Sequence, residues 1–242
     1  MKVFTKTDIG MTRSMNQDCY SVSNEENYKL YILADGMGGY KGGEIASKVA
    51  VTAVEKYIKE KFLTIPKEKE KILELIRDAI EFANTAIFEE SRQDVELHDM
   101  GTTIEVCLIY KNKVYIGHVG DSRIYRIRKN VMRRITTDHS YVEKLVKDGE
   151  ITREEAFHHP KKNLLIKALG TNKAVEPDII YKALVKDDIL VICSDGLTNM
   201  LREDRILEII KQDENIAVDL LISEANAAGG LDNITVILII NK

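Results

Sequence analysis

The sequence predicts a domain made of two packed β-sheets with helical layers outside them. Short segments with strand-like spacing of apolar residues occur in both halves of the chain, and pairs of helical apolar stripes occur near the start and near the end. At 242 residues, with 44% hydrophobic residues, the chain is long enough for one substantial core, and its three prolines leave few places for a linker. We therefore expect residues 1–242 to form a single domain.

The predicted elements follow one another with short connections. Before residue 140 we expect strands 3–7, 19–23 and 28–34, helices 44–58 and 72–87, and strands 103–110, 114–119 and 123–128. The last three strands are expected to form an antiparallel meander, because only short turns join them. A charged, loosely patterned segment at about 140–175 is expected to be a mobile flap. Beyond it we expect strands 179–184 and 189–193, helices 203–212 and 215–228, and a last strand 234–240.

The composition argues against several classes of function. The 39 acidic and 35 basic residues give a formal charge of -4, whereas a non-specific nucleic-acid binder needs clustered basic residues. The three cysteines form no Cys-x-x-Cys motif, so no disulfide framework is expected. The first residues lack an apolar segment, and no apolar run approaches the roughly 18 residues that span a bilayer. We therefore expect a cytoplasmic protein that binds neither nucleic acid nor membrane.

Aspartates stand beside glycines at the ends of several predicted strands. Asp35 follows the apolar run 30–34 and precedes Gly36, and Asp195 ends the run 189–194. The candidate acids at such chain positions are Asp18, Asp35, Asp121, Asp195 and Asp232, and four of these five border a glycine or follow one closely. Antiparallel strands would bring these ends to one rim, where neighbouring carboxylates repel each other unless a cation compensates them. The pattern therefore predicts a metal site.

The donor set points to hard divalent ions and to hydrolysis at phosphorus. Oxygen ligands suit Mn²⁺ or Mg²⁺ and disfavour zinc, and the five histidines have no ligand spacing. Two such ions sharing an aspartate and a water would lower the pKa of that water and yield a hydroxide that can attack phosphorus. The chain has no Gly-x-Ser-x-Gly elbow, Walker loop or Gly-x-Gly-x-x-Gly motif. Arg13 is the candidate phosphate ligand, because a guanidinium can hold two phosphate oxygens at once.

Seven short motifs span nearly the whole chain. They are Arg13-x-x-Asn16-Gln17-Asp18, Asp35-Gly36-Met37-Gly38-Gly39, Gly101-Thr102-Thr103, Gly120-Asp121-Ser122-Arg123, Asp138-His139-Ser140, Ser194-Asp195-Gly196-Leu197 and Gly230-x-Asp232-Asn233-x-Thr235. In this order they resemble the motifs of the type 2C (PPM) metal-dependent Ser/Thr protein phosphatases in their short bacterial form. One motif alone would be a weak signal, but seven in family order are specific.

The resemblance implies an α+β fold, a four-layer αββα sandwich of two antiparallel sheets flanked by helix pairs. It also implies hydrolysis of phosphoserine and phosphothreonine in proteins by a metal-bridging water or hydroxide. For the site, the resemblance implies that Asp35 bridges two Mn²⁺ or Mg²⁺ ions, that the Gly36 carbonyl binds one of them, and that Asp195 and Asp232 complete the other. It implies that Asp18 contacts the ions through water and that Asp121, with Asp195, holds a third, weaker ion. Arg13 would bind the substrate phosphate, and Asn233 would orient Asp232 or a metal-bound water.

Positions 17, 37 and 139 affect the expected metal binding and proton transfer. Met37 stands where many eukaryotic relatives have a histidine proposed as the general acid, so either a water bound at the Asp121 site or no dedicated acid serves here. Gln17 stands where those relatives often place a glutamate ligand, and weaker binding of one ion is the expected result. We expect His139 to cap the segment that follows it rather than to transfer a proton.

Two other functions stay open beside the phosphatase. A silent phosphopeptide-binding or regulatory module is disfavoured by the intact aspartate set, and a two-metal nuclease or phosphodiesterase is disfavoured by the lack of a basic track. For the phosphatase, the expected partners are phosphorylated proteins, including a bacterial Ser/Thr kinase that the enzyme opposes, and a monomer is expected. The sequence names neither the substrates nor the ion used in the cell.

Overall fold

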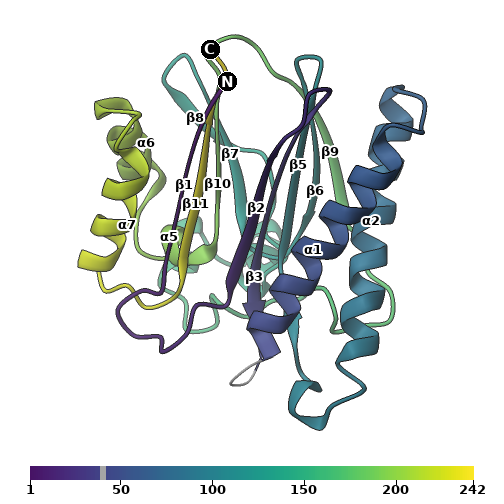
Figure 1. Ribbon diagram of the computed structural model, residues 1–242. Coiled ribbons are helices and arrows are strands. Elements are labelled where there is room, and N and C mark those ends of the chain that lie inside the picture. The colour runs from purple at the N-terminus through teal and green to yellow at the C-terminus, as the bar shows by residue number, and fades with distance from the viewer. Residues whose placement is uncertain (39–41) are drawn as a thin grey trace.

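A computed structural model describes residues 1–38 and 42–242, so Gly39 of the predicted glycine loop lies outside the described residues together with residues 40 and 41. Two antiparallel sheets pack face to face (Figure 1). One sheet has the order β1 (Lys2–Asp8), β11 (Ile234–Ile240), β10 (Ile189–Cys193), β7 (Arg123–Arg128) and β8 (Val131–Arg134). The other has the order β2 (Asp18–Asn24), β3 (Lys29–Met37), β5 (Ile104–Tyr110), β6 (Lys113–Val119) and β9 (Asp178–Ala183), with β4 (Gly101–Thr102) paired to β3.

Helix pairs cover the outer faces of both sheets. The long helices α1 (Gly42–Phe62) and α2 (Lys69–Glu90) pack on the sheet that contains β3, while α6 (Glu203–Gln212) and α7 (Ala217–Ala227) cover the other sheet (Figure 1). A single-turn 3-10 helix, Val95–Leu97, follows α2. The predicted αββα sandwich is thus confirmed.

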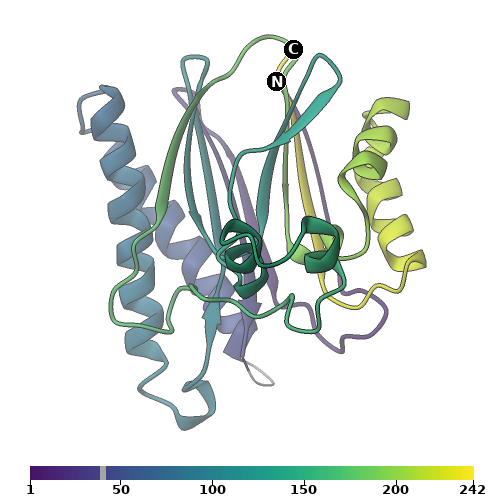
Figure 2. The same cartoon turned by 180° about the vertical axis from the view of Figure 1, so that it is seen from behind.

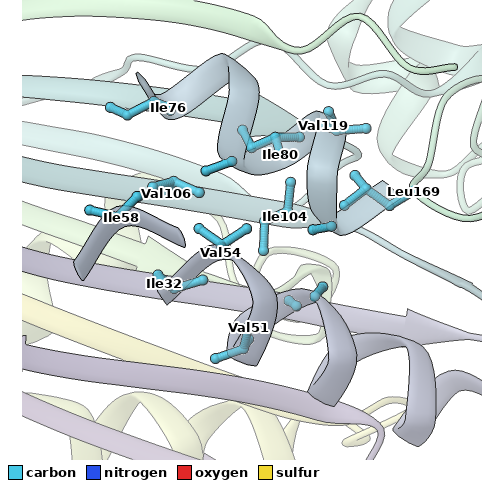
Figure 3. Packing of buried hydrophobic residues seen from close by; sticks show 14 of the residues in the cluster. Ile32, Val51, Val54, Ile58, Ile76, Ile80, Ile104, Val106, Val119 and Leu169 are labelled. Atoms are coloured by element: carbon cyan, nitrogen blue, oxygen red, sulfur yellow. The ribbon is translucent and has the colours of Figure 1, made fainter. Parts of the chain in front are cut away.

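The apolar core lies in three layers, one between the sheets and one under each helix pair. The apolar stripe predicted for residues 72–87 faces the core. Figure 3 shows side chains of both long helices, Val54, Ile58, Ile76 and Ile80, directed at strand residues that include Ile104 and Val106. Two of the three cysteines, Cys107 and Cys193, are buried in the strands as free thiols. No helix in the described ranges is both long and apolar enough to cross a bilayer.

The structure corrects the predicted meander. Strands β5 and β6 do form a hairpin, but β6 and β7 belong to different sheets, so the turn at Gly120 carries the chain from one sheet to the other. Gly120 has φ = +117°, a conformation that favours glycine, and an added Cβ would lie 2.5 Å from the Thr103 Cγ2 atom. This crossing places Asp121 between the ends of the two sheets.

Strand β3 continues further than the sequence predicts. The apolar run ends at Ala34, but β3 extends to Met37 because a change of partner supports the polar end. Asp35 pairs with Asp18 of β2, and Gly36 then pairs with Thr102 of β4. Asp35 is therefore held inside a strand and not in a loop.

The segment predicted as a flap contains two short helices, α3 (Tyr141–Lys147) and α4 (Arg153–Phe157). Figure 2 shows them in dark green, in front of the lower part of the sheets. Ser140 caps α3 by accepting the Glu143 N–H, so the cap predicted at His139 is wrong by one residue. The mobility of this segment stays a prediction.

Candidate metal centre

The five predicted aspartates come together where the two sheets end. Asp18 and Asp35 lie opposite each other on β2 and β3. Asp195, at the start of the single-turn helix α5 (Asp195–Thr198), is close enough for its charge to act on the Asp35 carboxyl group. Asp121 and Asp232 are close enough for their charges to act on Asp35 as well. The antiparallel geometry thus gathers acids from positions far apart in the sequence.

Burial, together with neighbouring carboxylates, raises the pKa values of four of the acids, Asp18, Asp35, Asp121 and Asp195. Burial, followed by the charges of Asp18 and Asp195, raises the pKa of Asp35 well above its usual value. Burial raises the pKa of Asp18 to about 7 and that of Asp195 to about 6. The pKa of Asp121 is also well above its usual value, because of burial and then the charge of Asp195. Such mutual repulsion is what bound cations relieve.

Hydroxyl groups hold Asp18 in place. Its Oδ2 atom accepts hydrogen bonds from Ser194 Oγ at 2.8 Å and from Thr235 Oγ1 at 2.6 Å. Its Oδ1 atom is buried and has no hydrogen-bond partner in the described part of the chain. A buried, unpaired carboxylate oxygen is costly unless something binds it. Both hydroxyl residues belong to the sequence motifs, but the motif alone did not indicate this contact.

Thr102 and Thr103 fix the backbone of Asp35. The Asp35 N–H donates to Thr103 Oγ1 at 2.9 Å, and the Asp35 carbonyl accepts from the Thr103 N–H and from Thr102 Oγ1, each at 2.9 Å. Thr103 Oγ1 also lies 2.9 Å from Ser122 Oγ, on the turn that carries Asp121. The Gly-Thr-Thr motif therefore links two of the acidic positions.

Two glycines allow close backbone approach beside the aspartates. An added Cβ at Gly36 would lie 2.0 Å from the Gly43 carbonyl oxygen, and one at Gly196 would lie 2.0 Å from the Asn233 carbonyl oxygen. No side chain fits at either position without moving the backbone. The Asp-Gly pairs are thus required by packing at the site and are not simply turns.

Arg13 contacts the cluster directly. Its Nη2 donates to Asp232 Oδ2 at 2.8 Å, and this bond, with smaller contributions from the charges of Asp195 and Asp35, raises the pKa of Arg13. About half of the Arg13 side chain is exposed, at 51%, so a substrate can reach it. The predicted position of an arginine beside the acids is therefore observed.

The Asn233 side chain is hydrogen-bonded to the loop that carries Arg13. Its side-chain amide donates to the carbonyls of Ile9 and Met15 and accepts the Gln17 N–H, so it fixes the loop that carries Arg13. Only its backbone N–H contacts Asp232, donating to Oδ1 at 2.9 Å. The prediction that Asn233 orients Asp232 or a metal-bound water stays a prediction.

A cavity of about 350 Å³ opens beside Asp121 and Asp195, between the two short helices α3 and α4 on one side and α5 and α6 on the other. Phe157 and Lys162 contribute to its lining. The charge of Lys162 slightly lowers the pKa of Asp195, although burial and the charge of Asp232 raise it more. The sequence indicated only a solvated basic loop at Lys162, because nothing local places that loop over the acids.

The oxygen donors of the acidic site suit hard divalent cations, although the described side chains do not enclose an ion. Among residues 1–38 and 42–242, no three Asp, Glu, His or Cys side chains converge closely enough to enclose one ion. Both oxygens of Asp232 are engaged in hydrogen bonds, with Arg13 and with the Asn233 N–H. Buried oxygens of Asp18 and Asp195 nevertheless have no described partner. Carboxylate oxygens beside backbone carbonyls are the ligands that Mg²⁺ and Mn²⁺ prefer.

Comparison with known proteins identifies the family to which this chain belongs. A family profile described as Protein phosphatase 2C matches residues 11–213. The serine/threonine phosphatase stp of Listeria monocytogenes is 39% identical over 237 residues, which cover 97% of this chain and 93% of that protein. The solved structure of the S. agalactiae serine/threonine phosphatase has a TM-score of 0.90 at 40% identity and covers 98% of each chain.

A further solved structure is similar over the whole chain. The catalytic domain of the serine/threonine protein phosphatase PstP, solved in complex with two manganese ions, has a TM-score of 0.85 at 31% identity and covers 100% of this chain and 98% of that one. The family profile and the sequence identity over almost the full length decide the classification. This chain belongs to the protein phosphatase 2C family, as the sequence motifs predicted.

Proposed function

We propose that this protein phosphatase hydrolyses phosphoserine and phosphothreonine in proteins with the help of two Mn²⁺ or Mg²⁺ ions. The observation that carries the proposal is the convergence of five aspartates, four of which have raised pKa values, beside an exposed arginine. The names of the relatives support the choice of substrate residue, and the manganese in the PstP structure supports the choice of ion.

We assign the ion-binding roles as the family resemblance implies. Asp35 would be shared by both ions, the Gly36 carbonyl would bind one, and Asp195 and Asp232 would bind the other. Asp18 would act through water, and Asp121 would hold a third, weaker ion together with Asp195. When bound, such ions activate a water for attack on phosphorus and neutralise charge on the phosphate oxygens.

Arg13 is the residue that would hold the substrate phosphate. A guanidinium has five N–H donors, more than its bond to Asp232 uses, and its planar fork matches two phosphate oxygens. Since Asp232 already orients the guanidinium at the edge of the acids, little side-chain freedom would be lost on binding. This positioning would place the phosphorus beside the carboxylates.

Neither Met37 nor His139 is suited to protonate the leaving alkoxide. Met37 has no acidic proton, and His139 has its Nδ1 atom occupied by the Gly120 N–H. Burial, followed by the charges of His118 and Lys167, lowers the pKa of His139 to about 4, so the ring is neutral near pH 7. We therefore expect the proton to come from water.

The wider setting is also part of the proposal. The partners would be phosphorylated proteins, including a Ser/Thr kinase whose action the phosphatase opposes, and the protein would work as a cytoplasmic monomer. The cavity between Asp195 and Lys162 gives a protein substrate an open approach to the acids. The support for these statements is the family membership and the exposed site.

A direct assay tests the proposal. The full chain would be incubated with p-nitrophenyl phosphate and with a phosphothreonine peptide in Mn²⁺ buffer, with and without EDTA. We expect metal-dependent phosphate release that Asp35→Asn abolishes and that Asp148→Asn leaves unchanged, because Asp148 belongs to an exposed Asp-Gly turn away from the acids. No metal-dependent release would overturn the proposal, and metal-dependent cleavage of DNA would instead support a nuclease.

A further inference from the structure

The proposed reaction gives no role to a group of ionisable residues behind Asp121. These residues are Glu105 on β5, His118 on β6 and His139 after β8. All three are buried, with exposed fractions of 0%, 0% and 9%. Buried ionisable side chains are uncommon and are normally paired for a reason.

His139 holds the turn that carries Asp121 by two hydrogen bonds. Its backbone N–H donates to the Gly120 carbonyl at 2.7 Å, and its Nδ1 atom accepts the Gly120 N–H at 3.1 Å. Gly120 directly precedes Asp121 and adopts the strained φ of the sheet crossing. Both backbone polar groups of Gly120, its N–H and its carbonyl, are therefore satisfied by one residue.

These contacts fix the protonation state of the His139 ring. A backbone N–H can only donate, so Nδ1 must be the unprotonated nitrogen and Nε2 must carry the proton. Nε2 lies 3.3 Å from Asp178 Oδ1 and 3.5 Å from Lys167 Nζ. Protonation of Nδ1 would set two donors against each other, which agrees with the low pKa of this ring. The turn is thus held by a neutral imidazole.

His118 and Glu105 support that ring from behind. The rings of His118 and His139 stack with centroids 4.6 Å apart and an angle of 25° between their planes. His118 Nε2 lies 2.9 Å from the Thr137 carbonyl and donates to it, while Nδ1 lies 2.5 Å from Glu105 Oε1. The contact between Nδ1 and Oε1 needs one proton, which either residue can carry. These contacts connect the stacked rings to strands β5 and β6 and to Thr137, which precedes His139.

We propose that His139 is a positioning residue for Asp121, acting through Gly120, and that the Glu105–His118 pair holds the His139 ring in place. The inference rests on the proposed function, because it concerns Asp121 as a ligand of the weaker ion. It predicts that loss of the Nδ1 acceptor affects that ion selectively. The two tighter ions, assigned to Asp35, Asp195 and Asp232, would be unaffected.

The test compares metal binding by four variants in the absence of substrate. Free Mn²⁺ would be followed by electron paramagnetic resonance during titration of the full-length protein. His139→Asn places an oxygen close to the position of Nδ1, whereas His139→Gln places it near Nε2, and His139→Leu removes the acceptor. His159→Leu is the matched control, because the Nδ1 atom of His159 also accepts a backbone N–H, from Lys161, at a distance from the acids.

We expect His139→Leu and His139→Gln to weaken the weaker Mn²⁺ site roughly tenfold or more, as losses of supporting contacts commonly do. His139→Asn and His159→Leu should bind all ions as the wild type does. Because His139→Asn and His139→Gln are both polar amides, a difference between them cannot be a general packing effect, even if His139→Leu folds poorly. Thermal unfolding of each variant would be recorded alongside.

Equal Mn²⁺ binding by His139→Asn, His139→Gln and the wild type would overturn the inference. If the wild type had no weaker Mn²⁺ site at all, the inference would also fall. In that case, release of nitrophenolate that still depended on Mn²⁺ would leave the phosphatase proposal standing. The two proposals can therefore fail separately.

Discussion

We expect His118→Phe to lower the free energy of unfolding by about 3–5 kcal/mol, the usual cost of removing one partner of a buried pair. The magnitude follows from the burial: both side chains of the Glu105–His118 pair are 0% exposed. The substitution leaves the Glu105 carboxyl group without its partner and the Thr137 carbonyl without its donor, at about 1–3 kcal/mol for each unsatisfied group. A phenyl ring is somewhat larger than imidazole but keeps an aromatic face against His139, so the polar loss dominates.

The double variant Glu105→Leu/His118→Phe should recover much of this loss, because two apolar residues leave no charge to solvate. Urea unfolding of the metal-free protein would measure the wild type, both single variants and the double variant. A coupling free energy of about 2 kcal/mol or more is expected between the two positions. A cost below about 1 kcal/mol for His118→Phe, or strictly additive effects, would refute the reasoning.

The pH dependence of this difference has a definite sign. Burial raises the pKa of Glu105 from 4.5 to about 7, and the charge of Glu105 raises the pKa of His118 in spite of the opposing effect of burial. The folded pair thus binds protons more tightly than the unfolded chain, so its contribution to stability falls as pH rises from about 4.5 through about 7. The stability of the wild type relative to the double variant should therefore be greater at about pH 5 than at about pH 8. The nearby Asp138 and Asp178 are present in both proteins, and their effects largely cancel in this comparison.

Three further predictions concern the metal centre and are tested by kinetics and metal titration. Arg13→Ala should raise KM by roughly 10- to 100-fold and lower kcat less, with the exposed Arg77→Ala as control, and unchanged constants would remove the assigned role. Asp121→Asn should keep the two tight ions, lose the weaker one and reduce kcat, so full activity would count against a third ion. Gln17→Glu should tighten the binding of one ion because it supplies a carboxylate. An unchanged affinity in calorimetry would contradict the expectation that glutamine at this position weakens ion binding.

Most of the fold could be predicted because each element carries its own periodicity. The stripe of α2 and the apolar run of β11 are visible in a short window, and both elements formed where expected. The turn at Gly120 could not be predicted in the same way, because a short glycine turn is compatible both with a hairpin and with a crossing between sheets. The choice depends on which strand pairs with β7, and that strand, β10, lies more than 60 residues further along the chain.

The acidic site could be predicted as a set of positions, but not as a set of contacts. Aspartates at strand ends, four of the five near a glycine, identify the residues, and antiparallel pairing explains why they meet. The supporting hydroxyls of Thr103, Ser194 and Thr235 were present in the motifs without an assigned role. The contacts of Ser194 and Thr235 with Asp18 join the two sheets, so they follow from the packing of the sheets and not from local pattern. The contact of Thr103 with Asp35 lies within one sheet and depends on the pairing of β3 with its neighbours.

The Glu105–His118 pair, by contrast, left a signal that the sequence analysis did not use. Each residue interrupts an otherwise apolar strand, and an ionisable side chain in a fully buried strand requires a partner. The turn at Lys111 and Asn112 sets the register of the hairpin, which places Glu105 directly opposite His118. Opposed residues on neighbouring strands point to the same face, so the pairing can be deduced by counting outward from the turn. The same deduction cannot reach His139, which joins the stack only because the chain crosses between the sheets at Gly120.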